Sequence, residues 1–224
     1  MNPTPKTSPA PKQAAASAAR ASWEFAERFV PESEHAAAAR RAADELGITS
    51  ITPGGTAVLG FLARLIDAHA AVEIGTGGGV SGLALLEGMN PDGILTSIDL
   101  ENEHQSLARR VFAATGIVPR RARLIAGAAL AVLPKLADRA YDLVFVDGDP
   151  LEYVEYVAQS ARLLRSGGLL VVNHAFCDDT VADPSCEADN TVIIREALEA
   201  VTEMEEFAPL LLPVGDGLLV ASRA

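Results

Sequence analysis

A glycine-rich segment, EIGTGGGVSGL over Glu73 to Leu83, is the strongest constraint on how this chain folds. Three of its five glycines, Gly77, Gly79 and Gly82, satisfy the pattern G-x-G-x-x-G. The segment follows the apolar run AAVEI and precedes the helical pattern VSGLALLEG. A strand, a glycine turn and a helix in this order bring the backbone close to a ligand at the carboxyl edge of a sheet. The segment therefore predicts an α/β sheet with a nucleotide-like ligand at this turn.

Further along the chain, short apolar runs alternate with helix-length segments. After AAVEI come ILTSID, ARLIAG, YDLVFVD and LLVVN, separated by segments with the 3.6-residue period of amphipathic helices. This alternation predicts parallel strands with helices packed on them. The last two runs, LLLPV and LLVAS, are separated only by GDG, which favours a hairpin. We therefore expect a Rossmann-like, doubly wound, mostly parallel seven-stranded sheet with an antiparallel C-terminal hairpin.

The chain before the first strand divides into a tail and a helical cap. Residues 1–20 are rich in Ala and Pro without a continuous apolar run, so we expect a disordered tail rather than a signal peptide or membrane span. Residues 21–224 are expected to form a single domain. Within it, residues 21–68 would form an N-terminal helical cap and residues 69–224 the cofactor-binding core.

Two helices are expected in the cap after the segment WEFAERFV. One runs from Glu32 to Leu46 and is closed by Gly47, which suits the left-handed conformation that ends many helices. The other runs from about Thr56 to Asp67. Both would lie before the first strand of the sheet.

The charge and the cysteines of the chain narrow the classes of partner. The chain has 18 Lys and Arg against 30 Asp and Glu, a net charge of −12. Nucleic-acid binding requires clustered basic side chains, so we expect a small molecule and neither nucleic acid nor membrane as partner. Cys177 and Cys186 lie in one loop-like segment, which favours a reduced, cytoplasmic protein over a disulfide scaffold.

Two carboxylates discriminate between candidate ligands of the glycine turn. Asp99 ends the second strand, 22 residues after Gly77, where a carboxylate accepts hydrogen bonds from ribose hydroxyls. Both NAD and S-adenosylmethionine carry such a ribose. Glu73 would repel a pyrophosphate but favour the ammonium and sulfonium of S-adenosylmethionine. The charges favour S-adenosylmethionine. Two simpler interpretations stay open: the glycines form a tight turn that binds no ligand, and Glu73 is a solvated carboxylate that caps a helix or ends a strand.

Three longer segments resemble, in order and spacing, the motifs of the catechol and caffeoyl-CoA O-methyltransferase-like family. They are AVEIGTGGGVSGLALL, TSIDLENEHQSLARRVFAATG and AYDLVFVDGDPLEYVEYVAQSARLLRSGGLLVVNHAF. The resemblance runs from about Trp23 to the end of the chain and is greatest with a subgroup of small bacterial O-methyltransferases. It implies an S-adenosylmethionine-dependent O-methyltransferase, a homodimer acting on a small hydroxylated, aromatic acceptor.

The resemblance also implies which residues contact the cofactor. They are Ile51, Glu73, Gly75, Thr76, Gly77, Gly79, Ser81, Asp99, Leu100, Ala128 and Asp149. Among them, Glu73 and Ser81 would line the methionine end of the cofactor. Asp99 would hold the ribose, and Ala128 would contact the adenine.

The catalytic end departs from the pattern of the family. Its members place two carboxylates and an amide around a divalent cation, Mg²⁺ or Mn²⁺, from a D-x-D-K segment and a later Asp-Asn pair. Here the first segment is DGDP, starting at Asp147, and the pair is Asn173 and His174, so a lysine and one negative charge are lost. The candidate metal ligands are Asp147, Asn173 and His174. Cys177 and Cys186 match no established zinc spacing with His174.

His174 has three interpretations: a third metal ligand suited to softer cations, a general base, or a structural residue. Asp147 would orient the acceptor hydroxyl, and His174 or Asp147 would take its proton. Asp147 and Asp149 also have a simpler interpretation, as carboxylates that cap the helix starting near Leu151. The other histidines receive no function in this interpretation: His35, His69 and His104.

Three other functions compete with methyl transfer to oxygen. Aminopropyl transfer is one, because VDGDP after a glycine-rich turn is similar to polyamine synthases on the same fold. A cofactor-binding regulatory module without catalysis is another, motivated by the lost lysine and the altered Asn173-His174 pair. An NAD-dependent dehydrogenase is the third, and Glu73 disfavours it.

Overall fold

The structure is a computed structural model that describes residues 20–224. The expected disordered tail, residues 1–20, lies outside the described residues except for Arg20, which belongs to a helix over residues 20–27. Within the described chain, every helix is too short or too polar to cross a bilayer.

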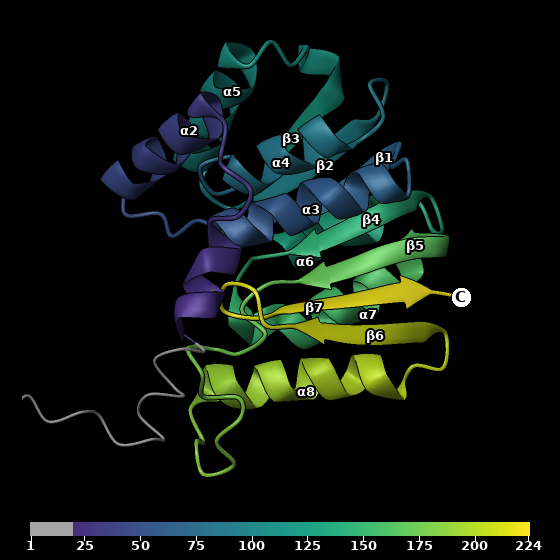
Figure 1. Ribbon diagram of the computed structural model, residues 1–224. Coiled ribbons are helices and arrows are strands. Elements are labelled where there is room, and N and C mark those ends of the chain that lie inside the picture. Colours follow the sequence, from purple (N-terminus) through teal and green to yellow (C-terminus); the bar gives the residue numbers. More distant parts are fainter. Residues whose placement is uncertain (1–19) are drawn as a thin grey trace, which may run out of the picture.

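Seven strands form one sheet in the order β3-β2-β1-β4-β5-β7-β6 (Figure 1). Their bounds are β1 Ala70–Ile74, β2 Ile94–Asp99, β3 Ala122–Ala126, β4 Tyr141–Val146, β5 Leu164–Val172, β6 Phe207–Leu212 and β7 Leu218–Arg223. The first five strands pair in parallel, and β7 runs antiparallel to both β5 and β6. The expected mostly parallel sheet with an antiparallel C-terminal hairpin is confirmed.

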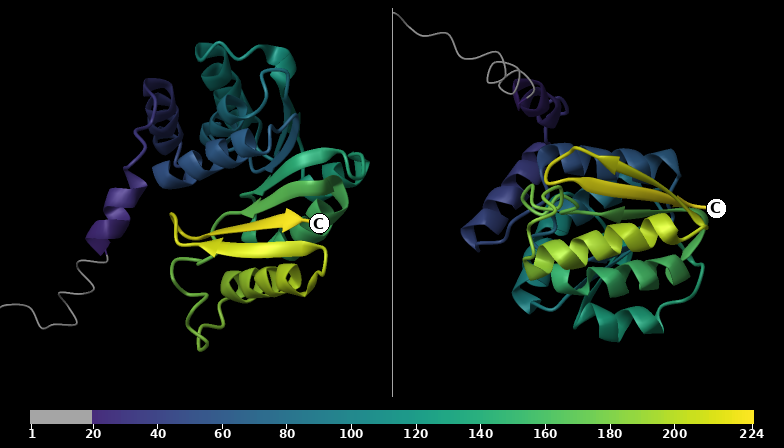
Figure 2. Two further views of the ribbon diagram at one scale, coloured as in Figure 1. Left: turned by 45° about the vertical axis from the view of Figure 1, so that its right-hand side comes forward. Right: turned by 90° about the horizontal axis from the view of Figure 1, so that it is seen from below.

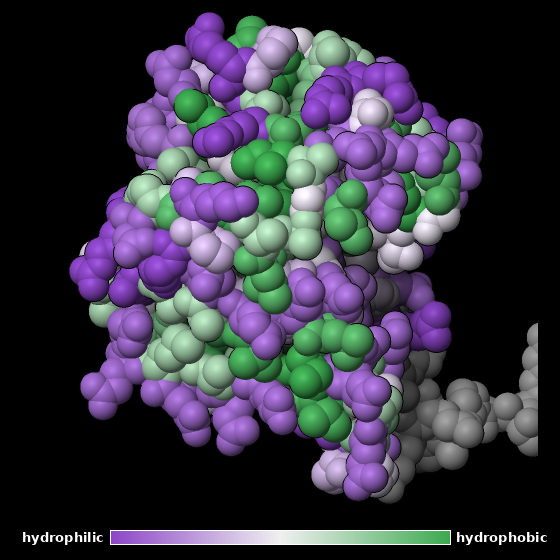
Figure 3. Space-filling view, turned by 180° about the vertical axis from the view of Figure 1, so that it is seen from behind, coloured by the Kyte–Doolittle hydropathy of each residue, from purple (hydrophilic) through white to green (hydrophobic). Residues whose placement is uncertain are grey.

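Helices cover both faces of this sheet. They are α2 Glu34–Glu45, α3 Pro53–Leu65, α4 Val80–Gly88, α5 Asn102–Ala114, α6 Ala129–Val132, α7 Tyr153–Leu163 and α8 Asp189–Glu203, with short 3₁₀ turns η1 Pro119–Arg121, η2 Leu133–Lys135 and η3 Pro150–Glu152. Because side chains alternate along a strand, Ala71 of β1 belongs to a core cluster with residues of α2, α3, α4 and α5, whereas its neighbour Val72 belongs to a second cluster with residues of α6, α7 and α8. Seen from behind, the surface of the molecule carries hydrophobic side chains interspersed among hydrophilic ones (Figure 3).

The two expected cap helices form, with shifted ends. Ser33 caps α2 by accepting a hydrogen bond from the backbone N–H of Ala36 at 3.1 Å, so this helix starts later than Glu32. α3 starts at Pro53 rather than Thr56, because the side chain of Thr52 accepts from the N–H of Gly55 and proline fits the first helical position. The N-terminal helices lie on the side toward which β4 and β5 point (Figures 1 and 2). They therefore lie beside the carboxyl ends of the parallel strands.

Candidate functional site

The carboxyl ends of β1 and β4 meet at the point where the strand order reverses. The N–H of Gly75 donates to the carbonyl of Ile98 at 2.8 Å, and the N–H of Asp147 donates to the carbonyl of Ile74 at 2.8 Å. Gly75 has a φ of +95°, and a Cβ added to it would lie 2.2 Å from the carbonyl oxygen of Asp147. Only glycine fits here, so this backbone contact fixes the start of the glycine turn against the end of β4.

A cavity of about 390 Å³ lies over these strand ends. Most residues expected at the cofactor line it: Ile51, Gly75, Thr76, Gly77, Ser81, Asp99, Leu100, Ala128 and Asp149. Asp147 and His174 line it as well. The structure thus brings the expected cofactor and catalytic residues to one hollow, at the switch point where open α/β sheets bind ligands.

Three expected residues do not line this cavity: Glu73, Gly79 and Asn173. Gly79 has a φ of +84° and faces α5 instead, since a Cβ added to it would lie 2.9 Å from Ala108. Glu73 is fully buried on the face of β1 that carries α4, behind Ser81. Neither residue lines this cavity, and a contact of Glu73 or Gly79 with the cofactor stays a prediction.

Glu73 is the centre of a buried network of hydroxyl groups. Its Oε1 accepts from Ser81 Oγ at 2.6 Å, and its Oε2 accepts from Ser97 Oγ at 2.5 Å. Ser97 Oγ in turn lies 2.6 Å from Thr76 Oγ1. Both Ser81 and Thr76 reach the cavity wall, so Glu73 fixes two wall residues without touching the ligand space.

Burial raises the pKa of Glu73 to about 8, although the two serine hydroxyls oppose the shift. The carboxyl group is therefore mostly protonated at neutral pH. A neutral Glu73 neither repels a pyrophosphate nor attracts a sulfonium, so its charge does not discriminate between NAD and S-adenosylmethionine. The discrimination between cofactors must come from other groups.

Asp99 is a preorganised acceptor at the end of β2. Its Oδ2 accepts from the N–H of Gly77 at 2.9 Å, and its Oδ1 accepts from the N–H of Glu101 at 2.8 Å. His104 Nδ1 lies 3.2 Å from Oδ1, and His104 lines the cavity. The residue pattern predicts no function for His104, although its place on the first turn of α5 directs it back to the end of β2.

Asp147, Asn173 and His174 come together at the ends of β4 and β5. Asn173 Nδ2 donates to Asp147 Oδ1 at 2.9 Å, and His174 Nε2 lies 3.6 Å from the same oxygen. On the other side of the ring, His174 Nδ1 lies 3.1 Å from Asp216 Oδ2. Burial raises the pKa of Asp147 above its usual range, while His174 and Asn173 oppose that shift. The imidazole thus lies between two carboxylates.

These side chains do not fit a divalent cation. Hard cations require several oxygen ligands that converge on one point. Here Asn173 turns its amide nitrogen to Asp147, and the ring nitrogen of His174 faces that same carboxylate. Within residues 20–224, no group of three His, Cys, Asp or Glu side chains could hold a metal. We therefore derive no step through a metal ion.

Asp149 has the capping function that its position also predicted. Its Oδ1 accepts from the N–H of Leu151 at 3.0 Å at the start of η3, and Asp149 also lines the cavity.

Cys177 and Cys186 are free thiols directed at the hydroxyl of Thr191, at 3.8 and 3.6 Å.

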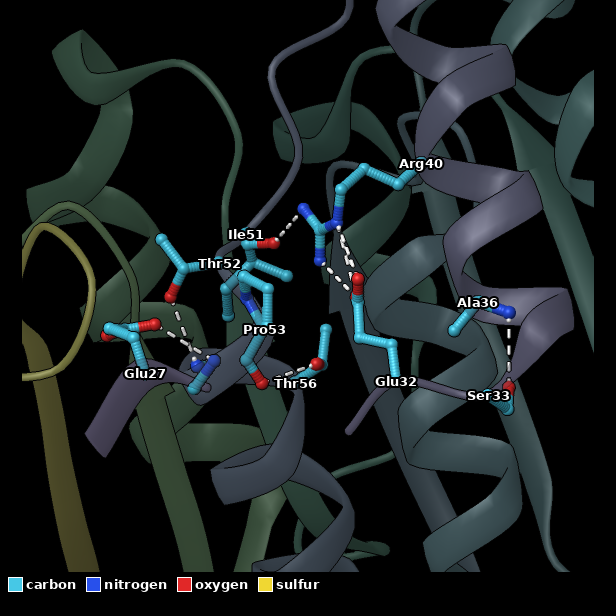
Figure 4. A network of polar contacts seen from close by, with 11 residues as sticks. Glu27, Glu32, Ser33, Ala36, Arg40, Ile51, Thr52, Pro53 and Thr56 are labelled. Carbon is cyan, nitrogen blue, oxygen red and sulfur yellow. Dashed lines mark hydrogen bonds and ion pairs between the residues drawn. The ribbon is translucent and has the colours of Figure 1, made fainter. Parts of the chain in front are cut away.

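The cap supplies residues that the sequence did not reveal (Figure 4). Arg40 donates to the carbonyl oxygen of Ile51 at 2.6 Å and pairs with Glu32 at 2.6 Å. Glu27 accepts from the N–H of Gly54 at 2.9 Å. These contacts fix the segment that brings Ile51 to the cavity, and they join residues 11 and 27 positions apart, which no local pattern indicates.

A doubly wound sheet with a glycine turn, an acidic residue after β2 and a cavity at the switch point defines a Rossmann-like cofactor-binding enzyme. The chain belongs to the O-methyltransferase family, whose model matches residues 32–224. It is therefore a methyltransferase, and the family expected from the motifs is confirmed.

Individual relatives agree with this assignment. The chain is 46% identical over 223 residues to a protein of Mycobacterium tuberculosis named "Probable O-methyltransferase", covering 100% of both chains. A crystal structure from Corynebacterium glutamicum is 31% identical, with a TM-score of 0.86 over 92% of this chain and 97% of the other. The O-methyltransferase TomG of Streptomyces achromogenes, involved in tomaymycin synthesis and solved in complex with SAM, is 28% identical, with a TM-score of 0.80 over 90% and 94% of the two chains.

The buried Glu73 predicts a pH dependence of stability that Glu73→Gln removes. An unfolded glutamate ionises near pH 4.5, whereas the folded one stays protonated up to about pH 8. Relative to Glu73→Gln, the wild type therefore loses unfolding free energy as the pH rises between these values, by about 1.4 kcal/mol per pH unit, with no further loss above the upper one. Urea unfolding of both proteins at several pH values measures the difference. The exposed Glu205→Gln is the control, and a pH-independent difference would contradict a protonated Glu73.

Proposed function

We propose that the protein transfers a methyl group from S-adenosylmethionine to a hydroxyl of a small, aromatic acceptor. The observation that carries this proposal is the single cavity that joins Asp99 to His174. Asp99 presents a fixed carboxylate suited to ribose hydroxyls, and His174 presents a ring nitrogen suited to the proton of an acceptor hydroxyl. The complex of TomG with SAM, a relative at 28% identity, supports the same cofactor here.

The rest of the cavity suits the remaining parts of this cofactor. α4 begins at Val80, and both Val80 and Ser81 line the cavity. The positive end of a helix favours a carboxylate such as that of the methionine moiety. Gly127 and Ala128, which follow β3, line the cavity beyond Leu100, which follows β2, and their small size suits a flat adenine ring. The methyl group would then lie toward Asp147 and His174.

Methyl transfer from a sulfonium is an in-line displacement, so the protein's main task is to orient the acceptor and take its proton. As the C–S bond breaks, its electron pair stays on sulfur and the acceptor oxygen bonds the methyl group. The hydroxyl proton passes to His174 or Asp147. The raised pKa of Asp147 brings that carboxyl group closer to the working range of a general base.

Membership of the O-methyltransferase family favours methyl transfer over aminopropyl or hydride transfer. A module that binds the cofactor without catalysis remains the main competitor, because the family's lysine is replaced by Pro150. It predicts binding of S-adenosylhomocysteine without methylation of any hydroxylated acceptor.

The first test is a calorimetric titration with S-adenosylhomocysteine, repeated with NAD. We expect S-adenosylhomocysteine to bind and NAD not to bind. Asp99→Asn removes the charge that accepts from the ribose and should weaken S-adenosylhomocysteine binding about 10- to 100-fold. Glu101→Gln, an exposed neighbour that meets Asp99 only through its backbone, should leave the affinity unchanged. Tight binding of NAD instead would make the glycine turn a dinucleotide site.

Chelation tests the absence of a metal step. Because the donors around Asp147 do not converge on one point, we expect turnover of catechols and monophenols to be unchanged by EDTA, measured as release of S-adenosylhomocysteine. Activity that disappears with EDTA and returns with Mg²⁺ or Mn²⁺ would show that Asp147, Asn173 and His174 rearrange around a cation.

We propose further that the protein is a homodimer of the cytoplasm. Large apolar side chains are exposed on the helix over residues 20–27, in the bend that follows it and on α3: Trp23 at 41%, Phe25 at 70%, Phe29 at 69% and Phe61 at 63%. Exposed apolar surface of this kind is typical of interfaces between copies. The free thiols agree with a reducing compartment. Light scattering after size-exclusion chromatography should give twice the chain mass of 23.4 kDa, and Phe25→Ser combined with Phe29→Ser should lower it.

A further inference from the structure

The turn between β6 and β7 reaches the candidate site from outside the cavity. Asp216 lies in this turn, does not line the cavity, and places Oδ2 at 3.1 Å from His174 Nδ1. The same carboxylate accepts from the backbone N–H of Asp178, at 2.9 Å on Oδ1 and 3.1 Å on Oδ2. Backbone contacts lock the turn to the segment after β5, since the N–H of Phe176 donates to the carbonyl of Asp216 at 2.8 Å. Asp216 therefore has a fixed position relative to the ring.

The backbone of His174 is held in an unusual conformation that serves this contact. Its φ is +55°, in the left-handed region that residues with a side chain rarely adopt. Such strain persists where the surrounding structure requires it, most often at functional sites. Here Nδ1 faces Asp216, and Nε2 lies 3.6 Å from Asp147, which lines the cavity together with His174.

We propose that Asp216 is a positioning residue for the methyl transfer, fixing the neutral imidazole of His174 with its proton on Nδ1. Nδ1–H donates to Asp216, so Nε2 carries the free electron pair. This proposal rests on the proposed function, and it makes Nε2 the atom that takes the proton of the acceptor hydroxyl. The acceptor O–H bond breaks as the O–CH₃ bond forms, the C–S pair stays on sulfur, and Nε2 takes the proton. Asp216 then stabilises the imidazolium that results.

The turn that carries Asp216 is itself held by the N-terminal helix. Glu27, in the helix over residues 20–27, accepts from the N–H of Gly215 at 2.6 Å with one oxygen and from the N–H of Gly54 at 2.9 Å with the other. A Cβ on Gly215 would lie 2.8 Å from Thr52 Oγ1, so the turn also packs on the start of α3. Glu27 therefore connects the segment of Ile51 to the turn of Asp216, although 188 residues separate it from Gly215.

Asp216→Asn tests the proposal through the orientation of the new amide. The N–H of Asp178 lies nearer Oδ1, at 2.9 Å, than Oδ2, at 3.1 Å, so we expect the amide oxygen in the place of Oδ1. The amide NH₂ then takes the place of Oδ2 and donates to His174 Nδ1. A ring that accepts at Nδ1 must carry its proton on Nε2, and it can no longer take a proton from the acceptor.

The first readout is the tautomer of His174, which nitrogen-15 NMR reports without any acceptor. Spectra are recorded at alkaline pH, and His174→Gln identifies its signals among the four histidines. We expect Nδ1–H in the wild type and Nε2–H in Asp216→Asn. Asp178→Asn is the matched control, since it makes the same charge change in the neighbouring loop and asparagine tolerates the left-handed backbone there (φ +52°). It should keep the wild-type tautomer.

The second readout is kinetic. With an acceptor that the wild type methylates, Asp216→Asn should lower kcat about 10²- to 10⁴-fold and leave the affinity for S-adenosylhomocysteine unchanged. Nε2–H in the wild type would overturn the proposal even if the variant does not fold, and so would an unchanged kcat or tautomer in a folded Asp216→Asn. Absence of methylation by the wild type would contradict the proposed function, while the tautomer still tests Asp216.

Discussion

The site depends on one close backbone approach, between Gly75 at the end of β1 and the carbonyl of Asp147 at the end of β4. A Cβ on Gly75 would lie 2.2 Å from that oxygen, so no other residue lets the two strands end side by side. β1 can therefore turn into α4 while β4 delivers Asp147. The neighbours of these two strands are β2 and β5, so Asp99 and His174 follow from the sheet order itself. One contact thus sets the cofactor end and the catalytic end of the same cavity.

Carboxyl groups with different surroundings divide the tasks within this small region. Glu73 receives only hydroxyl groups and no cation, so burial keeps it mostly protonated, as a neutral support for Ser81. Asp99 receives two backbone N–H groups, which stabilise a carboxylate that a ribose can use. Asp147 lies between these cases, buried but facing His174. The chemical type of each residue was visible in the sequence, and its charge followed only from its neighbours.

What the sequence predicted correctly are local features. Alternating apolar runs predicted the strands, GDG predicted the hairpin, and the sequence spacing from Gly77 to Asp99 predicted the acidic residue at the end of β2. The helix ends were shifted by a few residues because Ser33 and Thr52 cap them. The burial of Glu73 was missed, because a glutamate in a strand reads as exposed until the helix packed on it is known.

The partners of the proposed catalytic residues could not be predicted for a further reason. Asp216 is 42 residues from His174, and Gly215 is 188 residues from Glu27, so only the folded sheet brings them together. Nothing in the residue pattern of GDG distinguishes a hairpin turn from a turn that also carries a functional carboxylate. His104 was missed differently, since its contact with Asp99 spans five residues but crosses from a strand to a helix.

The departures from the family's pattern are related through one physical requirement. A cation activates a hydroxyl by drawing charge from its oxygen, and it needs converging oxygen ligands with negative charge. An imidazole activates the hydroxyl by taking its proton, and it needs only the correct tautomer. Asn173 lacks a charge that a cation would need, and His174, the proposed base, would serve only with Asp216 on its other nitrogen. Asn173 then acts as a donor that fixes Asp147 beside the ring, at 2.9 Å, rather than as a ligand. Asn173, His174 and Asp216 can thus be understood as one change from metal-assisted to base-assisted activation.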